Sequence, residues 1–173
     1  GMLRVIQNRD SNSAKGYYTS SAEARYYTGQ EQEMTGSWGG RAAERLGLYG
    51  DVTQHAFERL IDNRDPETGE RLTARNRKDR TPGYDFSFHA CKSSSLLYAL
   101  TGDPASLAAF RAAVDETMQD IEQRIQTRVR RGGRYEDRTV GNMAWAEFIH
   151  FTARPGGGAV DPHLHAHCFV INA

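Results

Sequence analysis

The most informative stretch of the chain is Asp161-Pro162-His163-Leu164-His165-Ala166-His167-Cys168-Phe169-Val170-Ile171, which holds three of the six histidines. From residue 164 to residue 171 it is apolar and rich in β-branched and aromatic side chains, which is typical of a buried β-strand. Side chains alternate across a strand, so His163, His165 and His167 face one way while Leu164, Ala166 and Cys168 face the other. His163 directly follows Pro162, where the loop can turn it away. This stretch therefore predicts a strand with a core face and a face of imidazoles.

A second apolar run precedes this strand at residues 143–151 (MAWAEFIHF). The Gly/Pro-rich linker between the two runs is short, so we expect antiparallel neighbours that place His150 opposite His165 or His167. Three convergent imidazoles with an open position are typical of a catalytic metal site, whereas a single histidine in a strand is more often a core residue. We predict that His150, His165 and His167 bind a metal ion. The donors leave its identity open, because imidazoles suit zinc, copper, iron and nickel, while magnesium and manganese prefer oxygen.

The remaining chain predicts more strands and several helices. Strands are expected at residues 2–7 and 83–88, and helices at 41–46, from Asp51 onward and at 93–100. The clearest helix begins at Asp103-Pro104. Its apolar residues recur at steps of three and four as far as Val129, and Gly132-Gly133 stops it.

Two adjacent tyrosine pairs, Tyr17-Tyr18 and Tyr26-Tyr27, stand in a segment that is otherwise small and polar. Packing is the alternative explanation, but the segment offers few apolar neighbours. A tyrosine can attack a phosphodiester and hold the product as a phosphotyrosine ester. Its ordinary pKa is about 10, so it needs a nearby base or a metal ion that stabilises the attacked phosphate. Tyrosines together with a tri-histidine site therefore predict phosphoryl transfer through a covalent intermediate.

Several motifs, in order along nearly the whole chain, resemble those of conjugative relaxases of the TrwC/TraI-like (MobF) family, a branch of the HUH endonucleases. Residues 161–167 resemble the family's D-P-x-L-H-T-H signature, with Ala166 in place of threonine, and residues 146–150 resemble the strand that carries its third histidine. Residues 83–93 resemble G-Y-D-x-x-F-x-x-x-K-S, with Ala90-Cys91 in place of Ala-Pro. Residues 38–48 resemble W-x-G-x-G/A-A…L-G-L, and the paired tyrosines match those near the family's N-terminus.

This resemblance implies an α/β (α+β) fold, an antiparallel β-sheet with flanking helices and one divalent metal ion, expected to be Mg, Mn or Zn, on the face of the sheet. It implies nicking and joining of single-stranded DNA at a plasmid transfer origin through a 5′-phosphotyrosine. Tyr17 would cut first, Tyr26 would act in a second transfer, and Tyr18 and Tyr27 would be auxiliary. Asp85 would orient a metal histidine or accept the tyrosine proton; the alternative is a strand-end residue that bonds the backbone.

The resemblance also sets expectations for the domain and its partners. Residues 1–173 would form a single relaxase catalytic domain that lacks its C-terminal side, because the family's DNA-binding domain runs further and a helicase often follows. The expected partners are transfer-origin DNA, that helicase domain and other relaxosome proteins. A replication initiator of the same superfamily, an inactive origin-binding module and a cupin-like metal oxygenase are the alternatives.

Composition bears on how the chain could attract DNA and on its cellular compartment. The 22 basic and 22 acidic residues balance, so any attraction for DNA must be local. Two basic clusters are candidates for phosphate contact. The first is Arg75, Arg77, Lys78 and Arg80, and its alternative is a solvated loop. The second is Arg128, Arg130 and Arg131, and its alternative is an interaction with the dipole at the end of the long helix. No run approaches the roughly 18 apolar residues of a membrane span, and the N-terminus lacks a signal peptide. With only two cysteines, expected to be reduced, we predict a cytoplasmic protein.

Overall fold

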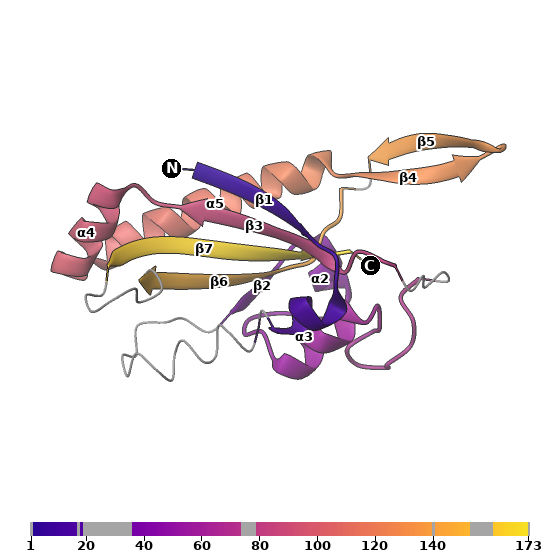
Figure 1. Cartoon of the computed structure of the whole chain (residues 1–173), viewed down its shortest axis with the longest axis horizontal. Coiled ribbons are helices and arrows are strands. Elements are labelled where there is room, and N and C mark those ends of the chain that lie inside the picture. Colours follow the sequence, from indigo (N-terminus) through magenta and orange to yellow (C-terminus); the bar gives the residue numbers. More distant parts are fainter. Residues whose placement is uncertain are drawn as a thin grey trace.

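The computed structural model describes residues 2–16, 18, 36–73, 79–139, 141–152 and 161–172. Five of the strands form one antiparallel sheet in the order β1-β3-β7-β6-β2 (Figure 1). The predicted antiparallel sheet with flanking helices is thus confirmed. The elements of this sheet and its helices are β1 (Met2–Asn8), β2 (Ser37–Gly39), α2 (Arg41–Arg45), α3 (Gln54–Ile61), β3 (Gly83–His89), α4 (Lys92–Thr101), α5 (Pro104–Arg124), β6 (Trp145–Thr152) and β7 (Pro162–Ile171).

Each face of the sheet packs against different helices. On one face, Val114 and Met118 of α5 join a buried cluster with Leu164, Ala166 and Cys168 of β7. On the other face, the apolar stripe of α3 packs against Phe148 and Phe169. Figure 1 shows α5 and α3 on opposite sides of the sheet. The alternation predicted for residues 164–168 is therefore confirmed.

The helix starts follow from local capping. Asp103 accepts a hydrogen bond from Ala105 N at 3.0 Å, and Pro104 opens α5, as predicted. The cap of α3 is Thr53, whose side chain accepts from Ala56 N at 3.2 Å, rather than Asp51. No helix in the described part of the chain is long and apolar enough to cross a bilayer.

The end of the long helix was predicted wrongly. Helix α5 ends at Arg124, and Ile125 is extended with φ −62° and ψ 133°. The next residues form a separate hairpin of β4 (Gln126–Arg131) and β5 (Arg134–Thr139). Gly132 and Gly133, with φ of 56° and 83°, make its two-residue turn, because positive φ at both positions favours such a turn. The glycines that were expected to stop a helix instead close a hairpin, which extends beyond the body of the molecule (Figure 1).

Glu122, near the end of α5, joins three segments. Its buried carboxylate accepts hydrogen bonds from Arg41 N and Met143 N, both at 2.8 Å through Oε2. One side chain thereby joins α5 to the first residue of α2 and to the segment that leads into β6. This contact holds the start of the strand that carries His150.

Candidate functional site

The three predicted ligands lie together on the face of the sheet that α3 only partly covers. His150 of β6 is the strand partner of His165 on β7, and His167 lies two residues further along β7. Their ring centroids are 5.2 Å apart for His150–His165, 5.2 Å for His165–His167 and 5.6 Å for His150–His167. Three imidazoles around one tetrahedral ion at zinc-like bond lengths would have centroids about 5.2 Å apart. The spacing of the rings fits a tri-histidine centre.

Neighbouring groups already orient two of these rings. His165 Nδ1 donates to the carbonyl oxygen of His163 at 2.8 Å. His167 Nδ1 lies 3.2 Å and 3.3 Å from the two carboxylate oxygens of Asp85, and 3.1 Å from Ser87 Oγ. An Nδ1–H that bonds to oxygen leaves the lone pair on Nε2, which is how ligand histidines are usually fixed. In this tautomer, Nε2 is the ring nitrogen that would coordinate an ion.

The electrostatic setting keeps His165 in the form that a metal needs. Burial lowers the pKa of His165 to about 3, and the nearby His150, His167 and His163 rings act in the same direction. The ring is therefore neutral at physiological pH, as a metal ligand must be. Within the described ranges no three His, Cys, Asp or Glu side chains converge closely enough to hold an ion as they stand. Loading would therefore require these side chains to reorient, although their ring centroids already have the spacing of a tri-histidine centre.

Asp85 belongs to the same surface. It lies on β3, and its side chain is only 15% exposed. In addition to His167, it contacts Ser87, whose Oγ donates to Oδ2 at 3.2 Å. Its carboxylate thus contacts a predicted ligand and a neighbouring hydroxyl, an arrangement that suits orientation of the His167 ring.

Of the four tyrosines, Tyr17, Tyr26 and Tyr27 lie outside the described residues. Tyr18 is described, and its ring packs 6.1 Å from Phe57 and 6.2 Å from Phe148. Phe148 is the strand partner of His167. Lys15, in the described segment that ends at residue 16, forms an ion pair with Asp62, between Nζ and Oδ2 at 2.7 Å, just after the end of α3. Tyr18 therefore fills an apolar cluster beside the histidine face.

The basic clusters are placed differently from what the sequence suggested. Arg80 has a role within the fold, because its guanidinium donates to the backbone carbonyls of Ile61 and Asn172 and so joins α3 to the end of β7. Burial also lowers its pKa. The other members of the first cluster lie outside the described residues: Arg75, Arg77 and Lys78. The second cluster consists of Arg128, Arg130 and Arg131. It lies on strand β4 and not at a helix end, so the alternative that these arginines interact with a helix dipole is wrong.

Two further residues of this face were missed by the sequence analysis. Ser87 bonds the ring of His167, and His89 is the strand partner of His165. The alternation that starts from Asp85 places residues 85, 87 and 89 on one face and could have identified both.

Comparison with known proteins finds similarity to conjugative relaxases at the level of the family model and of individual sequences. The family model for TrwC relaxase matches residues 11–173. The multifunctional conjugation protein TraI of Escherichia coli K12 is 36% identical over 172 residues, covering 99% of this chain and 9% of the relative. A second Escherichia coli TraI is 37% identical over 173 residues, with the same coverage.

Solved structures give a similar result. The metal-bound structure of conjugative relaxase TrwC in complex with OriT DNA has a TM-score of 0.79 and 30% identity, and the match covers 99% of this chain and 57% of that one. A copper-bound TrwC–OriT complex has a TM-score of 0.79 and 32% identity, with the same coverage. The chain thus spans less than a tenth of the TraI relatives and little more than half of the TrwC structures.

Proposed function

Because the chain belongs to the TrwC relaxase family, we propose that it is the catalytic part of a conjugative relaxase, which nicks and rejoins one strand of DNA at a plasmid transfer origin. The observation that carries the proposal is the group of His150, His165 and His167 with Asp85, on the half of a sheet face that α3 leaves uncovered. Residues 1–173 would form a single catalytic domain within a longer protein, working in the cytoplasm.

The metal would be held by the three histidines through their Nε2 atoms. The metal-bound and copper-bound structures of the relative support a divalent cofactor. Imidazole donors favour zinc or copper over magnesium, although Mg and Mn stay among the candidates. When bound, the ion would polarise the scissile phosphate. Asp85 and Ser87 would hold the His167 ring in position, and the carbonyl oxygen of His163 would hold that of His165.

Tyr17 would supply the nucleophile. Its hydroxyl oxygen bonds to phosphorus, the bond from phosphorus to the 3′ oxygen breaks, the tyrosine proton passes to a base or to water, and the leaving 3′ oxygen takes up a proton from that base or from water. The product is a 5′-phosphotyrosine and a free 3′ hydroxyl, so a later attack by another 3′ hydroxyl rejoins the strand. Tyr26 would perform a second transfer. Support comes from the family motifs and from Tyr18, which packs beside the strand partner of His167.

Recognition of DNA would involve the β4–β5 hairpin. It extends from the body, and its sequence carries Arg128, Arg130 and Arg131 (Figure 1). A two-stranded ribbon has the width to enter the major groove of duplex DNA, and arginines neutralise phosphates. The TrwC structures contain OriT DNA, which supports origin DNA as the partner of this chain. A helicase domain and other relaxosome proteins would be partners of the longer protein.

The test is incubation with a labelled single-stranded origin oligonucleotide and a divalent metal, followed by denaturing electrophoresis. We expect a protein–DNA adduct that disappears in Tyr17→Phe and in His150→Ala, and that persists in Tyr26→Phe. Tyr17→Phe changes almost no volume, so it should still bind metal and DNA. Mass spectrometry that finds the DNA on Tyr26 or Tyr18 would overturn the nucleophile. No adduct from a folded, metal-loaded protein would favour an inactive origin-binding module.

A further inference from the structure

Two more histidines lie beside the predicted metal centre and belong to no ligand set. His89 of β3 is the strand partner of His165, and His163 lies at the start of β7. Nδ1 of His89 is 3.1 Å from Nε2 of His163. The two rings are nearly parallel, at 17°, with centroids 5.0 Å apart. Two partly buried imidazoles therefore point their nitrogens at each other.

The geometry distinguishes two ways of using this pair. Two imidazoles joined by a straight N–H···N bond at this nitrogen separation would have ring centres about 5.4 Å apart. Two imidazoles that share one ion at zinc-like bond lengths would have nitrogens about 3.1–3.4 Å apart and ring centres about 4.9–5.2 Å apart. The observed 3.1 Å and 5.0 Å match the second case. The ring centres therefore lie closer together than a straight N–H···N bond would place them.

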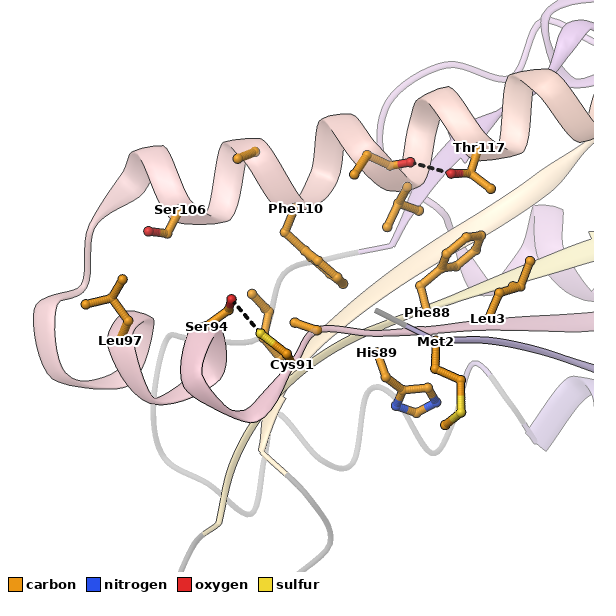
Figure 2. A pocket seen from close by; sticks show the side chains of 15 residues that line it. Met2, Leu3, Phe88, His89, Cys91, Ser94, Leu97, Ser106, Phe110 and Thr117 are labelled. Carbon is orange, nitrogen blue, oxygen red and sulfur yellow. Dashed lines mark hydrogen bonds between the residues drawn. The ribbon is translucent and has the colours of Figure 1, made fainter.

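The surroundings keep this pair distinct from the three-histidine centre. His165 stacks on both rings, with centroids 4.7 Å from His163 and 5.8 Å from His89, but its Nδ1 is committed to the carbonyl of His163 and so is not a donor for the second pair. Met2 is the strand partner of His89. Figure 2 shows Phe88 and His89 leaving β3 on opposite sides, with Met2 beside His89. Met2 carries a thioether, a soft donor, and water can complete the coordination shell.

We propose that His89 and His163 form a second metal site, next to the three-histidine centre and sharing no ligand with it. Its ligand class is a divalent transition-metal ion that accepts imidazole donors, such as zinc, copper or nickel. If the chain binds DNA as proposed, this ion adds positive charge beside the path of a phosphate backbone. The binding claim itself does not depend on nicking.

Zinc stoichiometry tests this site directly. The parent protein carries Cys91→Ser, because Cys91 is exposed and its hydrogen bonds to Ser93 and Ser94 lower its thiol pKa to about 7, which makes it a competing zinc ligand. After equilibrium dialysis against zinc and elemental analysis, we expect two ions per chain. His89→Gln and His163→Gln should each hold one. His55→Gln, an exposed histidine on α3, is the matched control and should hold two.

The variants separate the two sites. His150→Ala should also hold one ion, and combining it with His89→Gln should leave none. Circular dichroism checks that each variant is folded. One ion in the parent, lost in His150→Ala and kept in His89→Gln, would mean that His89 and His163 are only hydrogen-bonded, and would overturn the proposal. Two ions in both His89→Gln and His163→Gln would overturn it as well. Failure of the three-histidine centre would appear separately, as no loss in His150→Ala.

Discussion

Replacing Asp85 by Asn should weaken metal binding more than any other change outside the ligands themselves. The carboxylate holds the Nδ1 of His167 at 3.2 Å, and both side chains are mostly buried. A hydrogen bond to a charged group is worth about 1.5–3 kcal/mol. Loss of that bond should therefore reduce the metal affinity of the site by about 10- to 100-fold, the range typical of residues that orient a ligand histidine.

Isothermal titration with a divalent metal measures this effect, and Ser87→Ala is the matched control. Ser87 touches the same Nδ1 at 3.1 Å but is neutral, so its loss should cost about 0.5–1.5 kcal/mol, or roughly 2- to 12-fold in affinity. Together, the two variants test whether the loss of metal affinity is larger for Asp85→Asn than for Ser87→Ala, as well as the size of each loss. Equal losses in the two variants, or an Asp85→Asn protein that binds metal as tightly as the parent, would refute the claim that the carboxylate orients His167.

Three further predictions concern the fold. Burial and the contact with Asp115 raise the pKa of Glu147 to about 8. When folding raises the pKa of an acid, its protonated form contributes stability at a pH below the unfolded pKa. That contribution is lost as the pH rises through the pKa of the folded state. The free energy of unfolding should therefore fall by about 2 kcal/mol between about pH 6 and about pH 9, and urea titration of Glu147→Gln should find that fall abolished. Gly83→Ala should lower stability by at least about 1–3 kcal/mol in the same assay, because the new Cβ would lie 2.3 Å from the Val170 carbonyl. Arg80→Ala should lower stability by about 1–3 kcal/mol but leave the salt dependence of DNA binding unchanged; a shallower salt dependence would return Arg80 to the DNA path.

The parts of the site that lie on strands could be predicted from the sequence. Alternation is a local property, so residues 161–171 fixed which histidines share a face, and the short linker implied the antiparallel partner that brings His150 opposite His165. The predicted start of α5 was also local, since Asp103-Pro104 is a cap followed by a first-turn proline.

The parts that depend on tertiary contacts could not be predicted. The apolar positions Ile125 and Val129 continue a helical spacing, yet the chain leaves α5 at Arg124, because the Gly132-Gly133 turn allows the flanking residues to pair as a hairpin. Arg80 looked like part of a basic loop, and only the folded chain brings the carbonyls of Ile61 and Asn172 to it.

The arrangement of the strands has a consequence for how the site works. His150, His165 and His167 lie on β6 and β7, and Asp85 and Ser87 lie on β3, which are the three inner strands of the sheet. Asp85, Ser87, His165 and His167 lie where their strands pair on both sides, whereas His150 pairs only with β7, next to an irregularity in the β6–β7 register. The proposed nucleophile, in contrast, is a tyrosine that is not among the proposed metal ligands. Tyr17→Phe and Asp85→Asn should accordingly fail in different ways, the first retaining metal without the adduct and the second losing metal affinity.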